Sequence, residues 1–169
     1  MFKRRHPGLL LNNNRAFTLV EMLVVLGIMA ILASIAVPFA QTMVRRSNEM
    51  ELRSALRTVR TAIDKFNIDW TGGKISKFCD CASDDGYPKT LKVLSEGADM
   101  PGPVQRKVKY LRHIPRDPFA DQKLAADEQW GVRSYSDDPS SQSWGGQDVY
   151  DIYTKADRKA SDGSKYRDW

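Results

Sequence analysis

The stretch that decides the fold begins Arg15-Ala16-Phe17-Thr18-Leu19-Val20-Glu21-Met22. Apart from Glu21, no residue from Phe17 to Gln41 carries a charge. As a helix with a rise of about 1.5 Å per residue, this segment spans roughly 36 Å, enough to cross a bilayer with some tilt. A carboxylate inside such a segment is costly and by default marks a functional site with a partner. We therefore predict a membrane-spanning helix over residues 17–40, in which Glu21 pairs with a cation.

Cleavage of the chain before Phe17 would supply that cation, because it creates a new α-amino group and makes Glu21 the fifth residue of the processed chain. The residues before the cut are polar and basic rather than apolar. A secretory signal peptide instead has an apolar region of about 7–15 residues followed by a small-residue cleavage site. The basic leader and the long apolar run therefore disfavour a signal peptide or a simple signal anchor.

The helical pattern continues beyond Pro38 but becomes one-sided. Arg53, Arg57 and Arg60 take other faces than the apolar residues, and Glu49 and Arg53 are spaced for an i,i+4 ion pair. Gly72 and Gly73 then stop the helix. One helix is thus expected from 17 to 70, bent near Pro38, with an amphipathic second half over 41–70. Its apolar positions recur at three and four: Leu52, Ala55, Leu56, Val59, Ala62, Ile63 and Phe66.

The remaining residues, 71–169, are expected to form one small globular head. Residues 74–109 are loop-rich with one short helix at 89–96, and the segments 129–136 and 147–154 favour strands. We predict an α+β fold in which a small antiparallel sheet packs on the amphipathic half of the helix, giving a lollipop.

Charge and cysteine content limit the function classes. The net charge is +5, but Lys3, Arg4, Arg5 and Arg15 contribute four of these charges, so the basic composition does not indicate nucleic-acid binding. The two cysteines, in Cys79-Asp80-Cys81, leave three alternatives open: loop thiols, a disulfide, or metal ligands. No nucleophile–base pair stands out, and His113 beside Pro115 suits a surface or packing role. We predict no enzymatic activity.

The motif Ala16-Phe17-Thr18-Leu19-Val20-Glu21, followed by the apolar run and Pro38, resembles the processing site of type IV pilins and type II secretion pseudopilins. The resemblance implies that a prepilin peptidase removes the leader, residues 1–16, between Ala16 and Phe17 and that Phe17 is N-methylated. Ala16 replaces the glycine usual before the cut. Phe17, Glu21 and Pro38 would then serve assembly of a helical homo-oligomeric fibre with an inner-membrane assembly platform.

Within this family, the head resembles that of type II secretion major pseudopilins. The resemblance implies a subunit of a periplasmic pseudopilus that drives protein export, anchored by a single span in the bacterial inner membrane with its head in the periplasm, and associating with other pseudopilins. A type IV pilin-like fibre subunit is the first alternative, and a membrane-anchored periplasmic enzyme or binding protein the second. The segments that carry the likeness are 86–91, Asp151-Ile152-Tyr153-Thr154, Asp168-Trp169 and Tyr110-Leu111-Arg112-His113-Ile114-Pro115-Arg116-Asp117-Pro118-Phe119.

Major pseudopilins also carry a calcium site in the C-terminal loop. Asp157 matches its first carboxylate and Asp162 is a displaced substitute for the second, because Ser164 stands at the matching position. Arg158 replaces a glycine, and nearby lysines would repel the ion. A solvated loop held by ion pairs is the alternative to a Ca²⁺ site at Asp157 and Asp162.

Overall fold

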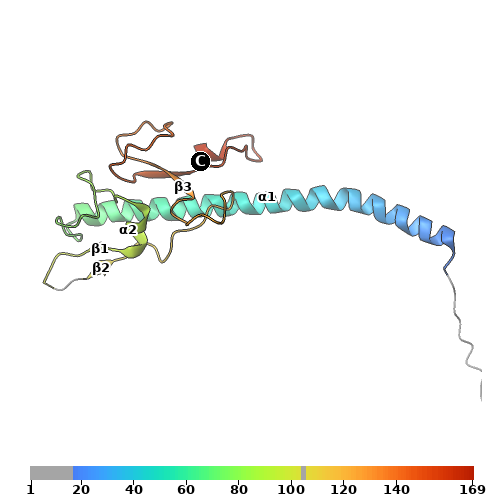
Figure 1. The fold of residues 1–169 in the computed structure, drawn as a ribbon, viewed down its shortest axis with the longest axis horizontal. Helices are drawn as coiled ribbons and strands as arrows, with labels where there is room; N and C mark the ends of the chain where they lie inside the picture. Colours follow the sequence, from blue (N-terminus) through green and yellow to red (C-terminus); the bar gives the residue numbers. More distant parts are fainter. Residues whose placement is uncertain (1–16, 104–105) are drawn as a thin grey trace, which may run out of the picture. The chain divides into compact units, whose positions relative to one another are not determined.

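A computed structural model describes residues 17–103 and 106–169, so the leader and Ala16 lie outside the described residues. Its main element is helix α1, Leu19–Thr71 (Figure 1). Thr18 starts α1, since its Oγ1 accepts a hydrogen bond from the backbone N–H of Glu21 at 3.2 Å. Gly73, at φ +73°, ends it with a backbone conformation that favours glycine. The predicted helix is confirmed to within two residues at each end.

The chain divides into two compact units, one ending at Met43 and one from Val44 to Trp169. In the first unit α1 continues through Pro38 without interruption, and the predicted bend at Pro38 stays a prediction. The boundary after Met43 lies close to the predicted end of the membrane segment at residue 40. The second half of α1 accordingly belongs to the head.

In the second unit the apolar face of α1 forms the core, as its spacing predicted. All seven predicted apolar positions, from Leu52 to Phe66, are buried. Arg60 lies outside this apolar face. It donates one hydrogen bond from Nε to the Asp151 carboxylate at 2.7 Å and another from Nη2 to the Ile152 carbonyl at 3.0 Å. These bonds attach a strand to the helix. The core is completed by Ile75, Leu94, Trp130, Val149, Ile152 and Tyr166, among others.

The main sheet joins β3, Trp130–Arg133, to β4, Asp151–Thr154, in an antiparallel pair. Both strands are shorter than predicted, because carboxylates replace the ladder beyond Arg133. Asp137 accepts a hydrogen bond from the Ser134 N–H at 2.7 Å, and Asp148 accepts one from the Tyr135 N–H at 3.0 Å. The α+β prediction is confirmed with strands of only four residues each.

The structure has a second sheet that the sequence did not predict. Strands β1, Ala98–Asp99, and β2, Lys107–Val108, pair antiparallel within the segment that was expected to be loop. Strands of two residues show no alternation in sequence, which explains the omission. Helix α2, Leu91–Glu96, begins two residues later than predicted, since the bridge between Ala82 and Pro88 keeps the preceding chain extended.

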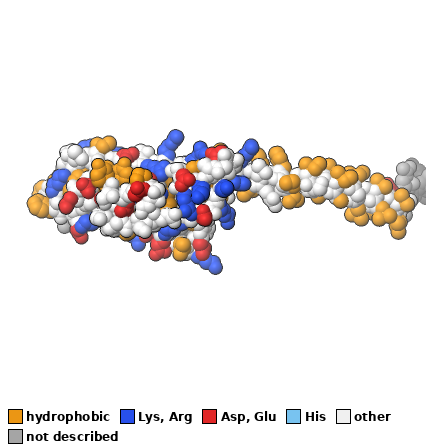
Figure 2. All heavy atoms as spheres, turned by 90° about the horizontal axis from the view of Figure 1, so that it is seen from above, with side chains coloured by type: hydrophobic (Ala, Val, Ile, Leu, Met, Phe, Trp, Pro, Cys, Tyr) orange, Lys and Arg blue, Asp and Glu red, His pale blue; other side chains and the backbone are white. Residues whose placement is uncertain are grey.

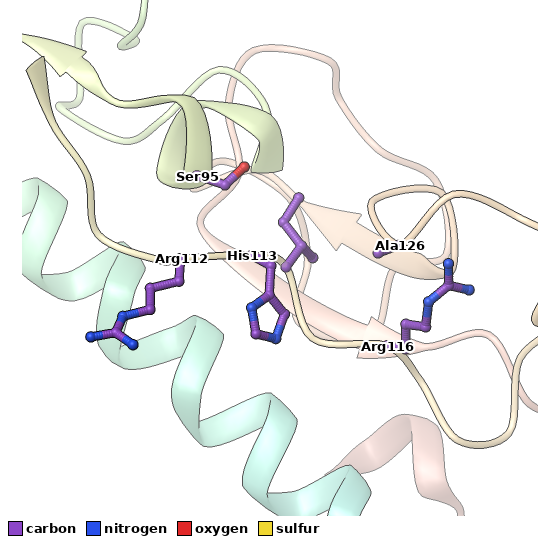
Figure 3. A pocket seen from close by; sticks show the side chains of 6 residues that line it. Ser95, Arg112, His113, Arg116 and Ala126 are labelled. Carbon is purple, nitrogen blue, oxygen red and sulfur yellow. The ribbon is translucent and has the colours of Figure 1, made fainter.

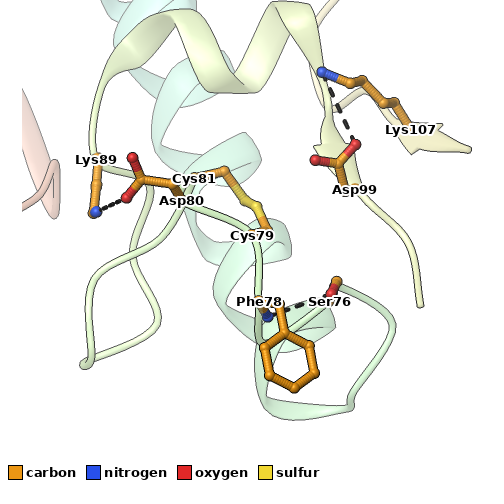
Figure 4. The surroundings of a disulfide bond; sticks show 8 residues. All are labelled: Ser76, Phe78, Cys79, Asp80, Cys81, Lys89, Asp99 and Lys107. Atoms are coloured by element: carbon orange, nitrogen blue, oxygen red, sulfur yellow. Dashed lines mark hydrogen bonds and ion pairs between the residues drawn. A yellow bond between two sulfur atoms is a disulfide. The ribbon is translucent and has the colours of Figure 1, made fainter. Parts of the chain in front are cut away.

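The short disulfide loop resolves one of the alternatives left open by the sequence. Cys79 and Cys81 form a disulfide with each other, with their Cα atoms 5.1 Å apart (Figure 4). Lys89 pairs with Asp80 between them. Of the three alternatives for the cysteines, the structure therefore has the disulfide.

Candidate assembly segment and the head that carries it

The N-terminal part of α1 exposes apolar side chains on every face. Leu26 and Phe39 are 64% and 67% exposed, Phe17 just before the helix is 69% exposed, and Figure 2 shows apolar side chains along this stretch. By length and composition α1 could cross a membrane, and none of its most apolar window is buried. A helix that is apolar all round needs lipid or other apolar helices around it. This part of α1 therefore has the composition of a segment that is buried in lipid or among other apolar helices.

Glu21 lies in the first turn of α1, on this exposed segment. Within residues 17–103 and 106–169, no cation forms an ion pair with its carboxylate. The predicted partner, an α-amino group at Phe17 of another copy, belongs to a processed and assembled state. The roles of Ala16, Phe17, Glu21 and Pro38 thus remain predictions.

In the head, a carboxylate on α1 holds the C-terminal loop. Glu49 accepts hydrogen bonds from the Ser161 N–H at 2.9 Å, the Ser161 hydroxyl at 2.7 Å and the Tyr166 hydroxyl at 2.8 Å. Burial raises the pKa of Glu49, but the bonds from Ser161 and Tyr166 outweigh it and lower the pKa. Arg45 adds an ion pair at 3.3 Å. The charged form of Glu49 is therefore favoured in the folded head.

Glu49 does not pair with Arg53, contrary to the i,i+4 prediction. Arg53 instead lies 3.4 Å from Asp162 and places its guanidinium 3.9 Å from the ring centre of Trp169. Both side chains contact the C-terminal loop instead of each other. Sequence spacing along one helix could not show this, because the partners are more than 100 residues away.

The two predicted calcium ligands each have a cationic partner. Asp157 pairs with Arg167 at 2.8 Å, while Asp162 accepts bonds from Ser164 and faces Arg53. The described part of the chain holds no group of three or more His, Cys, Asp or Glu residues arranged to bind a metal. Calcium binding by this loop stays a prediction.

A buried carboxylate anchors the Ile114–Phe119 turn. Asp117 is fully buried, accepts a hydrogen bond from the Phe119 N–H at 2.8 Å and another from the Thr154 hydroxyl. Gln129 also accepts a hydrogen bond from the backbone N–H of Asp117 at 3.0 Å. The Thr154 contact attaches the turn to β4, and the Gln129 contact attaches it to the residue before β3. The sequence indicated a turn here, because Asp117 lies between two prolines, but it could not show that Thr154 of β4 is the partner of Asp117.

His113 lies at an open groove of about 660 Å³ lined also by Ser95, Arg112 and Arg116 (Figure 3). Its imidazole is exposed, and the Ser95 hydroxyl donates to the Lys92 carbonyl within α2 at 3.1 Å. A nucleophile would need a base within hydrogen-bond reach. The groove does not show such a pair, in keeping with the predicted surface role of His113.

Comparison with known proteins identifies the N-terminal segment. Residues 11–37 match the profile of the prokaryotic N-terminal methylation motif. The segment is type IV pilin-like. Over 60 residues the chain is 38% identical to the type IV major fimbrial protein FimA of Dichelobacter nodosus, a match that covers 36% of this chain and 38% of that protein. No solved structure matches the chain.

These matches bear on the two fibre hypotheses. The methylation motif covers Phe17, Glu21 and most of the apolar run, and it ends one residue before Pro38. The named relative is a fimbrial protein rather than a secretion pseudopilin. The comparisons thus support the pilin-like alternative better than the narrower pseudopilin interpretation.

Proposed function

We propose that this chain is a non-enzymatic structural subunit of a type IV pilin-like fibre. The observation that carries the proposal is an exposed apolar helix with one carboxylate, Glu21, whose first part matches the methylation motif over residues 11–37. The helix is held in the bacterial inner membrane before assembly, with the head in the periplasm. A prepilin peptidase removes residues 1–16, and an assembly platform transfers the subunit into a helical homo-oligomer.

In this proposal Glu21 sets the register between subunits. An ion in an apolar environment is costly unless it is paired, so the processed amine of Phe17 on a neighbour is drawn to it. Apolar contacts alone would permit many sliding registers, because the segment offers similar side chains on all faces. One buried ion pair per interface selects a single register.

The test compares Glu21→Val and Glu21→Gln with the wild type in the native host. Both variants should insert in the membrane and be processed at wild-type levels, since removal of a charge favours insertion. The yield of fibres sheared from the cells should fall by about ten-fold or more. The reason is that losing about 1.4 kcal/mol of ion-pair free energy at each interface lowers the association constant ten-fold. Wild-type fibre yield from both variants would overturn the proposal.

A type II secretion pseudopilus is the second candidate. It is favoured by the buried Asp117 turn, since the segment Tyr110–Phe119 resembles that of major pseudopilins. The subunit would then associate with other pseudopilins and serve protein export. Deletion of the gene distinguishes the two functions: loss of exported proteins from the medium with intact surface fibres would favour the pseudopilus.

A calcium ion held by Asp157 and Asp162 is proposed as a stabiliser of the C-terminal loop. Calcium takes six to eight oxygens, so backbone carbonyls and water would complete the set. Binding must displace Arg167 from Asp157 and Arg53 from Asp162. Both aspartates are exposed, which leaves room for such a rearrangement.

A further inference from the structure

Five basic residues gather at the end of the second unit where its part of α1 begins. Two of them, Arg45 and Arg46, lie on α1, and three lie on the C-terminal loop. We call this set the basic collar. Its members are Arg45, Arg46, Arg158, Lys159 and Lys165, all of them exposed.

Specific contacts bring the loop to this end of α1. Arg45 donates a hydrogen bond to the carbonyl of Lys159, and Ser161 bonds to Glu49 one turn further along the helix. Lys159 and Lys165 face each other across an isolated antiparallel bridge. The fold therefore collects cations from residues more than 100 positions apart in the sequence.

The charge of the collar is poorly neutralised by the head. Only Arg45 has an acidic partner among the described residues, Glu49, while Arg46, Arg158, Lys159 and Lys165 form no ion pair there. Like charges directly opposite each other on neighbouring strands are destabilising, so the Lys159–Lys165 pair is unfavourable in isolation. An external anion at this position would remove that cost.

We propose that the basic collar binds the anionic headgroups of phospholipids while the subunit is held in the membrane. This inference rests on the proposed function, in that residues 17–40 must span the bilayer. Arg45 and Arg46 follow the apolar segment within a few residues, so at about 1.5 Å per residue they lie at headgroup depth. Each Lys or Arg of a juxtamembrane basic cluster raises the binding constant for an anionic lipid surface by a factor of about five.

The C-terminal loop contributes three of the five cations of the basic collar. Because Glu49, Arg45 and Arg53 all hold this loop on α1, the lipid contact involves folded tertiary structure and not only a basic stretch of sequence. Lipid binding would orient the head at the membrane surface before assembly. The competing occupant is an acidic surface on a second copy of the chain.

The experiment titrates the full-length protein in a neutral detergent with phosphatidylglycerol or phosphatidylcholine and counts bound lipids by native mass spectrometry. The test variant is Arg158→Ala/Lys159→Ala/Lys165→Ala. The control, Lys107→Ala/Lys109→Ala/Lys123→Ala, removes the same charge from exposed positions outside the collar. Incorporation of each protein into lipid nanodiscs is measured alongside, because it reports on the membrane segment by itself.

We expect wild type and control to prefer phosphatidylglycerol, and the collar variant to bind it at least about five-fold more weakly, with the preference weakened in high salt. Equal weakening in collar and control variants would overturn the inference, since net charge alone would explain it. A collar variant that binds lipid normally but loses detergent-stable dimers would also overturn it, in favour of the second copy. Failure to enter nanodiscs would instead count against the proposed membrane segment.

Discussion

Replacement of Glu49 by alanine should loosen the C-terminal loop and destabilise the head. The carboxylate of Glu49 accepts bonds from Ser161 and from Tyr166, whose side chain is buried, and pairs with Arg45. A hydrogen bond to a charged group contributes about 1.5–3 kcal/mol, and such bonds are not additive when they share an acceptor. Arg45 is half exposed, so its share is small. We expect a loss of about 2–3 kcal/mol in the free energy of unfolding.

The assay heats the full-length protein in detergent and monitors its unfolding by the near-ultraviolet circular dichroism of the tryptophans, all of which lie in the head. For a domain of this size about 4 °C corresponds to 1 kcal/mol, so the melting temperature should fall by about 8–12 °C. The matched control is Glu51→Ala, an exposed glutamate two positions along α1, which should change stability by less than about 0.5 kcal/mol. Equal melting temperatures for Glu49→Ala and the control would refute the reasoning.

The pH dependence gives an independent check on the same carboxylate. Because the folded pKa of Glu49 is lowered, its contribution to stability is present above the unfolded pKa of about 4.3 and is lost as the pH falls through the folded pKa. The difference in unfolding free energy between wild type and Glu49→Gln should therefore be constant near neutrality and shrink below about pH 4. A difference that grows on acidification would contradict the assignment.

Three further predictions concern other parts of the chain. Mature protein from the native host should begin at N-methylated Phe17, and mass spectrometry that finds Met1 in assembled fibres would exclude the processing. Calcium should raise the melting temperature of the full-length protein by several degrees and magnesium much less, and Asp157→Ala should abolish the difference; an unchanged curve with chelator would favour the ion-paired loop. Asp117→Ala leaves the buried Thr154 hydroxyl without its acceptor, so chemical denaturation should show a loss of about 2–4 kcal/mol. Thr154→Val should also destabilise the head, because it leaves an oxygen of the buried Asp117 carboxylate without its donor and the Ala156 N–H without its acceptor; wild-type stability of either variant would contradict this.

The sequence alone determined the parts of this protein that depend on local pattern. The uncharged run after Phe17 predicted α1, and the spacing from Leu52 to Phe66 identified its buried face, because a helix repeats over a few residues. Gly73 marked its end for a similarly local reason. The methylation motif could also be read directly, since it is a contiguous stretch.

Only the tertiary structure decided which distant residues meet. Glu49 could have paired with Arg53, four residues away, yet its partners are Ser161 and Tyr166. Strand β3 ends where Asp137 captures the Ser134 N–H, which no alternation of residues reveals. Hydrogen bonds of this kind join elements far apart in the chain, and their free energy depends on a geometry that exists only after the core around Trp130 and Ile152 has packed.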